Sequence, residues 1–177
     1  MRRISVVGTS CAGKTTIARR IADHYRIPHI ELDKVFWGPN WTPLPLDKYR
    51  SAVEALAAGD EWVIDGNYSK VRDIVWSRAT DVVWMNLTLT TVLWRVIKRT
   101  VRRIVTQEEL FAGNRETFRN AILSRDSLIW WVIRTHRGRN RALREMLKSE
   151  EYSRLQLHEV RGANDEISLL DFDRSEG

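Results

Sequence analysis

The sequence contains very little cysteine and little proline. Its single cysteine among 177 residues, Cys11, excludes an internal disulfide framework and a zinc site made of several cysteines, so a reducing compartment is expected. Three of the four prolines fall within residues 36–45. This clustering predicts a structured loop there rather than a helix or a strand.

Long apolar runs are absent as well. No segment of the sequence is long and apolar enough to cross a bilayer, and residues 1–3 lead directly into an expected strand instead of the apolar part of a signal peptide. The hydrophobic content of 43% is sufficient for one core. We therefore expect a single soluble, cytoplasmic domain spanning residues 1–177, with no membrane partner.

The positive charge of the chain is concentrated in one region. The net charge is +6, yet residues 95–144 alone hold 13 Lys and Arg against four acidic residues, a local surplus of +9. Most of these cations are arginines, whose planar guanidinium binds phosphate oxygens in pairs. Such a segment suits phosphoryl transfer and a nucleic-acid backbone equally well, so charge alone leaves both open.

Residues 8–16, GTSCAGKTT, match the phosphate-binding loop G-x-x-x-x-G-K-[ST]. The glycines let backbone N–H groups point at phosphate oxygens, Lys14 reaches the outer phosphates, and the Thr15 hydroxyl takes a Mg²⁺ position. A turn with a chance lysine is the alternative, but the apolar run before the loop and the helical spacing after it favour a phosphate loop. The residues predicted to bind ATP are Gly8, Thr9, Ser10, Cys11, Ala12, Gly13, Lys14, Thr15 and Thr16.

Five short apolar segments are predicted to be strands, with helical spacing between them. They are residues 2–7, 29–32, 62–65, 81–87 and 155–160. His158 is expected to be a half-buried strand residue rather than a catalyst. The loop at residues 161–164 leaves a strand end on the nucleotide side and is a candidate for contact with adenine.

Asp33 and Asp65 each follow or end one of these strands. Ligands of open parallel sheets gather at the carboxyl ends of strands, so Asp33 is expected near the phosphate loop, where it would orient or deprotonate a substrate hydroxyl. The alternative is that Asp33 only caps the following turn. Asp65 ends an apolar strand as a Walker B aspartate does, and is predicted to hold Mg²⁺ through water.

Candidate substrate-binding residues lie beside these two acids. Trp37 and Trp41 either form a wall for a flat or apolar substrate or cover the core at the edge of the domain. Arg72 either binds substrate or lies solvated on the surface. The predicted substrate-binding set is Asp33, Trp37, Trp41, Asn67, Tyr68 and Arg72.

A helical pattern rich in arginine begins at Thr91 and is interrupted at residues 107–114. Two arginine-bearing helix ends around a short insert predict a lid, about residues 99–119, that closes over the phosphates and excludes water. The alternative is a solvated charged face. On the first helix, Arg95, Arg99 and Arg102 are expected to share one face. Arg99 and Arg115 are predicted to be catalytic, and Arg95 and Arg119 to bind the nucleotide.

The chain resembles the adenylate-kinase-related P-loop proteins labelled DNA topology modulation, or FlaR-like, proteins. Besides the phosphate loop, the resemblance rests on Leu32-Asp33 before Trp37 and Trp41, on residues 62–68 (WVIDGNY), and on Arg99 followed by residues 113–116 (GNRE). It implies an α/β three-layer P-loop NTPase fold, in which helices flank a five-stranded parallel sheet. It also implies a small helical lid, and ATP with Mg²⁺.

The sequence departs from adenylate kinases at two points. Adenylate kinases continue after Asp65-Gly66 with Phe-Pro-Arg, whereas residues 67–69 read NYS here, which weakens the case for AMP as the acceptor. The cysteines that bind zinc in some adenylate kinase lids are also absent.

The sequence therefore predicts an ATP-dependent phosphotransferase, a nucleotide, nucleoside or small-molecule kinase that uses the γ-phosphate of MgATP. A second hypothesis is a nucleotide-gated regulator that binds DNA or RNA through the basic residues 134–144, although no groove-reading motif supports it. A plain ATPase switch is weaker, because a lid serves to exclude water. No pattern identifies the acceptor or the oligomeric state.

Overall fold

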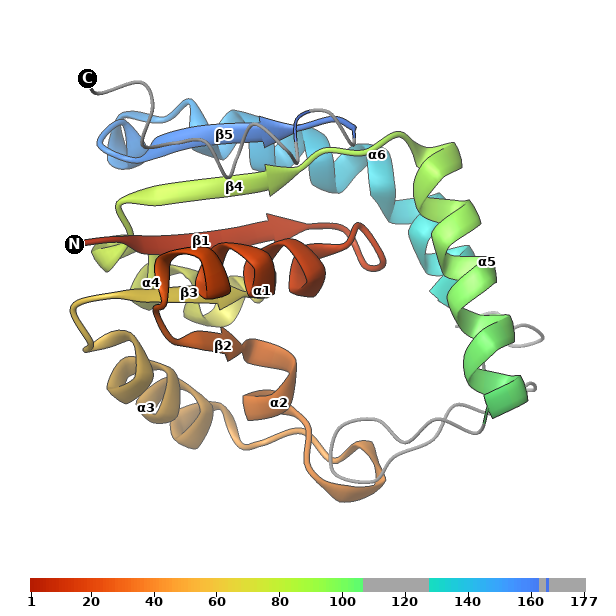
Figure 1. Cartoon of the computed structure of the whole chain (residues 1–177), viewed down its shortest axis with the longest axis horizontal. Coiled ribbons are helices and arrows are strands. Elements are labelled where there is room, and N and C mark those ends of the chain that lie inside the picture. The colour runs from red at the N-terminus through yellow and green to blue at the C-terminus, as the bar shows by residue number, and fades with distance from the viewer. Residues whose placement is uncertain (107–127, 163–164, 166–177) are drawn as a thin grey trace.

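Five parallel strands form one sheet in the order β2-β3-β1-β4-β5 (Figure 1). The computed structural model describes residues 1–106, 128–162 and 165. All five predicted strands are confirmed. Their bounds are β1 Arg3–Gly8, β2 His29–Glu31, β3 Trp62–Asp65, β4 Asp81–Met85 and β5 Gln156–Val160.

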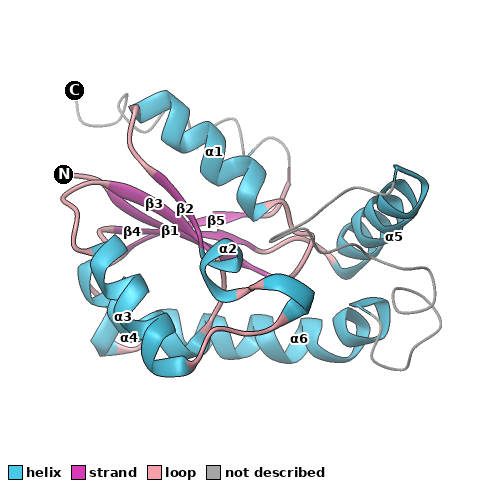
Figure 2. Cartoon of the chain, turned by 90° about the horizontal axis from the view of Figure 1, so that it is seen from below, coloured by secondary structure: helices cyan, strands magenta, loops and turns pink. Residues whose placement is uncertain are grey.

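Helices cover both faces of the sheet. Figure 2 shows α1 on one face and α3, α4 and α6 on the other, so the predicted three-layer α/β architecture is confirmed. Among the described helices, none combines the length and apolarity needed to cross a membrane. The helices are α1 Lys14–Tyr25, α2 Leu32–Phe36, α3 Leu46–Ala57, α4 Arg72–Arg78, α5 Leu89–Thr106 and α6 Leu128–Leu147. Short 3-10 helices are η1 Pro39–Trp41, η2 Ser69–Val71 and η5 Glu150–Tyr152.

The predicted loop at residues 36–45 is partly wrong, because it contains helical turns. Phe36 is the last residue of α2, and Pro39 begins the 3-10 helix η1. Proline fits the first position of a helical turn, since its φ is already set and its missing N–H has no partner to lose there. A backbone bridge between Trp37 and Pro43 closes the segment.

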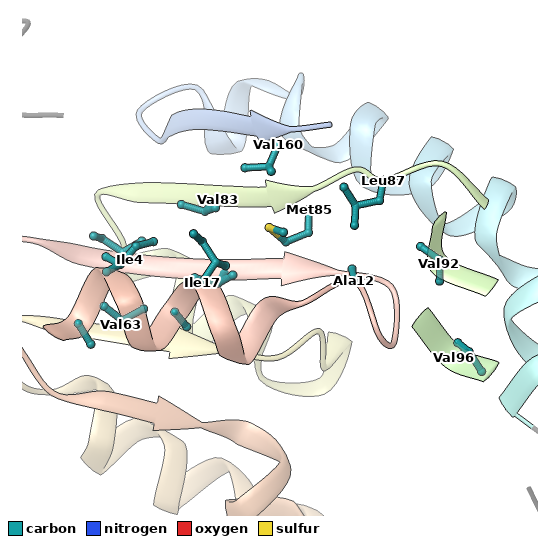
Figure 3. Close-up of a cluster of buried hydrophobic side chains, with 14 of the residues drawn as sticks. Ile4, Ala12, Ile17, Val63, Val83, Met85, Leu87, Val92, Val96 and Val160 are labelled. Carbon is teal, nitrogen blue, oxygen red and sulfur yellow. The ribbon is translucent and has the colours of Figure 1, made fainter. Parts of the chain in front are cut away.

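Alternate residues of β1 pack in two cores on opposite faces of the sheet. Val6 belongs to the core beneath α1. Figure 3 shows Ile17 and Val83 in the same core. Val7, the chain neighbour of Val6, belongs to the core on the other face, together with Trp62. Successive side chains of a strand point to opposite faces, so a strand between two helical layers must be apolar throughout. For this reason the strands are continuous apolar runs in the sequence.

Replacing the buried Trp76 with alanine is expected to destabilise the protein by about 3–5 kcal/mol. The Trp76 side chain is 1% exposed, its indole N–H donates to the Ser5 hydroxyl at 3.1 Å, and its ring contacts the edge of Tyr152. Truncation leaves a cavity and an unpaired buried hydroxyl. Urea unfolding measures the change in the free energy of unfolding. The half-exposed Trp130 provides the control, since Trp130→Ala is expected to cost less than about 1 kcal/mol; equal losses would contradict the prediction.

Candidate functional site

A pocket of about 1370 Å³ lies at the carboxyl edge of the sheet. Its walls come from the phosphate loop after β1, from α2 and η1, from the loop after β3, and from α5 and α6. Figure 1 shows these elements arranged around the carboxyl ends of β1, β2 and β3. This is the edge at which open parallel sheets bind their ligands.

The phosphate loop has a backbone conformation that requires its glycines. Gly8 and Gly13 have φ of 152° and 95°, and a Cβ on Gly8 would lie 2.8 Å from the Cβ of Met85. Helix α1 starts directly after Gly13 and has no acidic residue in its first turn. Its free N–H groups and the positive end of its dipole therefore lie at the pocket, as an anion site requires.

Most of the predicted loop residues reach the pocket surface. Those that line it are Gly8, Ser10, Cys11, Gly13, Lys14, Thr15 and Thr16. Thr9 and Ala12 are buried and do not line it. These two residues shape the loop, since the Ala12 N–H donates to the Thr9 carbonyl at 3.2 Å.

Lys14 is a buried cation close to both predicted acids. Its ammonium donates to the Thr9 carbonyl at 3.2 Å. Burial lowers the pKa of Lys14, and the negative charges of Asp33 and Asp65 oppose that shift by favouring the charged form. The structure therefore brings the three residues into electrostatic contact at the end of the sheet.

Asp33 lines the pocket at the start of α2. Its carboxylate accepts a hydrogen bond from the Tyr68 hydroxyl, and Tyr68 lines the same pocket. Burial, and then the bond to Asp33, raise the pKa of Tyr68, so its hydroxyl stays protonated and acts as a donor. Glu31 occupies the N-cap position of α2, which has no side-chain cap. Asp33 therefore does not cap α2.

Asp65 is more deeply buried than Asp33. It is 3% exposed, and its Oδ2 atom lies 3.7 Å from His29 Nε2. Neither atom has a hydrogen-bond partner within the described part of the chain. Asp65 does not itself line the pocket, whereas Thr15 does. The unsatisfied carboxylate oxygen of Asp65 and the Thr15 hydroxyl are both hard oxygen donors of the kind that Mg²⁺ prefers. These residues therefore fit the predicted metal.

The two predicted aromatic residues both line the pocket. Trp37 packs edge-on against Trp41, with ring centroids 5.7 Å apart, and against Phe36 at 4.8 Å. Phe36 in turn contacts Tyr68. Trp37 and Trp41 therefore stand on the pocket wall together with Asp33.

Asn67 lines the pocket, but Arg72 does not. The Arg72 guanidinium donates to Asn67 Oδ1 at 3.1 Å and to the Met146 sulfur, and lies over the Trp76 ring. The sequence suggested that Arg72 either binds substrate or lies solvated on the surface. It does neither in this pocket, since its side chain is half-buried and holds Asn67 from behind the pocket wall. The sequence could not show this, because Met146 belongs to a distant helix.

Three arginines of α5 line the pocket, but one of them differs from the prediction. Arg95 donates to the Ala12 carbonyl at 2.7 Å, and Arg99 and Arg103 lie further along the same wall. Arg102 is exposed. The buried residues of α5 include Val92 and Val96, and Arg103 lies closer to that side of the helix than Arg102.

Only part of the predicted lid is described. Helix α5 extends to Thr106, and the remainder of residues 99–119, including Arg115 and Arg119, lies outside the described residues. Residues 163 and 164 of the predicted adenine loop also lie outside them. His158 is partly buried on β5 and contacts Asp81 Oδ1 at 2.9 Å, in agreement with the structural interpretation.

Sequence reasoning missed two pocket residues on α6. Trp131 and Arg139 both line the pocket, with the Arg139 guanidinium 4.8 Å from the centre of the Trp131 ring. Burial lowers the pKa of Arg139, and no described acidic residue forms an ion pair with it. Their spacing of two helical turns beside the buried Val132 was the available signal.

The basic segment at residues 134–144 is divided by the fold. Arg139 turns into the pocket, Arg141 pairs with Glu145 at 2.9 Å, and Arg144 pairs with Glu159 at 3.3 Å. The remaining exposed arginines of this segment are Arg134 and Arg137. Of the five arginines in the predicted patch, one therefore lines the pocket and two are paired with glutamates.

Comparison with known proteins supports the fold. No protein-family model and no curated protein matches the sequence. The chain is similar in structure to a shikimate kinase from Bacteroides thetaiotaomicron, with a TM-score of 0.58, 15% identity, and coverage of 99% of this chain and 97% of that chain. It is also similar to a gluconokinase from Sinorhizobium meliloti, with a TM-score of 0.55, 19% identity, and coverage of 99% and 94%.

A shikimate kinase from Aquifex aeolicus gives a TM-score of 0.56 at 14% identity, with coverage of 99% of this chain and 95% of that chain. These comparisons do not test the narrower resemblance to DNA topology modulation proteins. At such identities the likeness concerns the fold alone. The chain has the α/β, P-loop kinase-like fold.

Proposed function

We propose that this protein is an ATP-dependent phosphotransferase that moves the γ-phosphoryl group of MgATP to a hydroxyl group of a small anionic acceptor. The observation that carries this proposal is that Lys14 and Asp33 line one pocket at the carboxyl edge of the sheet, where the negative charges of Asp33 and of the buried Asp65 at the end of β3 both act on Lys14. A buried lysine at a helix N-terminus suits a phosphate chain, and two nearby carboxylates suit a metal ion and an acceptor hydroxyl.

The pocket has room for two substrates. Its volume of about 1370 Å³ exceeds the roughly 300–1,000 Å³ typical of a site for one drug-sized ligand. The phosphate loop and α5 bound the side assigned to the nucleotide. Asp33, Trp37 and Tyr68 bound the side assigned to the acceptor. The phosphoryl group would therefore pass between the two sides near Lys14.

On the nucleotide side, the chain neutralises negative charge. Lys14, the N–H groups of the phosphate loop, and the side chains of Arg99 and Arg103 would bind the phosphate oxygens and the charge that develops during transfer. Mg²⁺, held by Thr15 and through water by Asp65, supplies further charge neutralisation when bound. Arg95 fixes the loop itself through its bond to the Ala12 carbonyl.

On the acceptor side, Asp33 orients and deprotonates the nucleophile. The hydroxyl group of the second substrate donates a hydrogen bond to the Asp33 carboxylate. The carboxylate takes the hydroxyl proton as the hydroxyl oxygen attacks the γ-phosphorus. The bond from the γ-phosphorus to the bridging oxygen breaks, and ADP leaves. Tyr68 donates to Asp33 and thereby holds the carboxylate in one orientation.

Arg139 supports an anionic acceptor. It is a half-buried cation on the pocket wall with no ion pair to any described acidic residue. It lies near Arg72, since the pKa of Arg72 is lowered by burial first and also by the positive charge of Arg139. Arg72 donates a hydrogen bond to Asn67, the chain neighbour of Tyr68, so we assign the nearby Arg139 to the acceptor side of the pocket. A carboxylate or phosphate on the acceptor would pair with it.

Arg139→Met is therefore expected to raise KM for the acceptor by about 10- to 100-fold, the value of a hydrogen bond to a charged group, with little change in KM for ATP. Steady-state kinetics with each substrate varied in turn measures both constants. Arg141→Met, at an exposed position of the same helix, is the control and should leave both unchanged. A rise in KM for ATP alone would assign Arg139 to the nucleotide.

ADP release with acceptors of different classes tests the function itself. The panel includes shikimate and gluconate, named by the structurally similar kinases, with nucleosides and nucleoside monophosphates. We expect ADP release that depends on an anionic, hydroxyl-bearing acceptor and that is lost on mutation of Lys14. Failure to bind ATP, or turnover that Lys14→Met does not change, would refute the proposal.

A further inference from the structure

The outward side of α5 carries an exposed apolar row. Trp94, Ile97, Val101 and Val105 are 65%, 45%, 51% and 76% exposed. Their spacings of three, four and four residues place them on one face of the helix. We call this row the α5 stripe. At 1.5 Å per residue it is about 16 Å long. A soluble protein rarely exposes so many large apolar side chains in one row without a binding partner.

Cations accompany this stripe. Residues 89–106 hold five Lys and Arg and no acidic residue. Arg95, Arg99 and Arg103 line the pocket on the other side, whereas Lys98 and Arg102 are exposed beside the stripe. The outward face of α5 therefore combines a tryptophan, three aliphatic side chains and two cations. This composition is typical of helices that lie in a membrane interface.

The charge of this face selects among its possible partners. A second copy of the chain, related by a two-fold axis, would bring Lys98 and Arg102 against the same cations of its partner. A nucleic acid would pair with the cations but would leave the four apolar side chains against phosphates and sugars. An anionic lipid surface matches both, since aliphatic side chains insert below the headgroups and Lys98 and Arg102 pair with them.

We propose that the α5 stripe binds the surface of a bilayer that contains anionic lipids, with α5 lying along the interface. Both Figure 1 and Figure 2 show α5 at one end of the molecule, beside α6 and away from α1 and α3. The contact is with the membrane surface and involves no membrane-spanning segment. The opposite face of the same helix remains in the pocket wall.

Sedimentation of the full chain with vesicles tests this proposal. We expect binding to phosphatidylcholine vesicles that contain phosphatidylserine, weaker binding as salt is raised, and little binding to pure phosphatidylcholine. Tryptophan emission should shift to the blue on binding, and Trp94→Phe should reduce that shift. No binding to either vesicle, or equal binding to both, overturns the proposal.

Matched variants distinguish binding through the α5 stripe from non-specific binding to vesicles. Val101→Asp should weaken vesicle binding by at least about tenfold, because the variant lacks an aliphatic group that would be buried in the membrane on binding. Leu56→Asp, at an exposed aliphatic position of α3, should bind as the unmodified protein does. Lys98→Gln should weaken binding about fivefold, the value of one cation near an anionic surface, whereas Lys48→Gln on α3 should not. Equal losses in stripe and control variants would overturn the proposal.

Two further measurements keep the outcome decisive. ATP binding and the thermal midpoint should be unchanged in Val101→Asp; if that variant misfolds, Trp94→Ser replaces it, at the position with 65% exposure. Sedimentation velocity and DNA binding are measured on the same variants. A dimer, or a DNA complex, that Val101→Asp disrupts in the absence of vesicle binding would assign the stripe to that partner instead.

Discussion

Replacing Lys14 with methionine is expected to lower kcat/KM for ATP by about 10²- to 10³-fold, the usual effect of removing one preorganised charge donor from a transition state. Methionine keeps the length of the side chain and removes its charge. Lys14 is buried between the phosphate loop and two carboxylates, so water cannot replace the missing cation effectively. Steady-state kinetics and fluorescence titration with a nucleotide analogue measure the loss.

The matched control for this variant is Lys48→Met, at an exposed position of α3. It removes the same charge from the chain but lies outside the pocket lining. The kcat/KM for ATP and the affinity for the nucleotide analogue should both be unchanged in Lys48→Met. If Lys14→Met kept full turnover and nucleotide affinity, the phosphate loop would have no part in the activity, and the proposed function would fail with it.

Replacing Asp33 with asparagine is expected to lower kcat by about 10²- to 10⁴-fold, the range for loss of a general base. The asparagine side-chain oxygen can still accept a hydrogen bond from the Tyr68 hydroxyl. The contact with Tyr68 is therefore retained, while the group that takes the proton is lost. Nucleotide affinity should change little, because Asp33 is assigned to the acceptor. Single-turnover kinetics at saturating ATP separates the chemical step from binding.

Asp47→Asn, in the exposed first turn of α3, is the control for the removal of an aspartate charge. It should leave kcat unchanged. A second diagnostic is Tyr68→Phe, which removes the donor to Asp33 and should lower kcat by less than Asp33→Asn does. If Asp33→Asn reduced ATP affinity and left the rate of the chemical step unaltered, Asp33 would be a nucleotide or metal residue instead of a base.

Much of the fold followed from local patterns. The apolar runs that contain Val6, Ile64 and Val83 predicted strands, because a strand buried on both faces has no polar alternation. The spacing of Gly8, Gly13 and Lys14 predicted the phosphate loop, since the conformation after β1 needs glycine at those points. The placement of Asp33 near this loop followed from the rule that parallel strands end at one edge.

Other parts of the site depended on contacts between distant segments. Tyr68 reaches Asp33 across 35 positions of the chain, and Arg72 holds Asn67 while contacting Met146 across 74. No local pattern encodes such pairs. The nucleic-acid interpretation of residues 134–144 grouped Arg139 with its neighbours by charge, although its side chain lies in the pocket wall.

The sequence by itself determined the strand and helix segments, the phosphate loop and the two acids beside it, because each of these depends on residue spacing within one segment. Only the tertiary structure decided that Arg103 rather than Arg102 lines the pocket, that Arg139 joins it from α6, and that the α5 stripe points outward. The physical reason is that a helix can rotate about its axis without changing its own hydrogen bonds. Packing against distant residues such as those of β4 and α6 selects one rotation, and that selection determines which side chains meet a ligand.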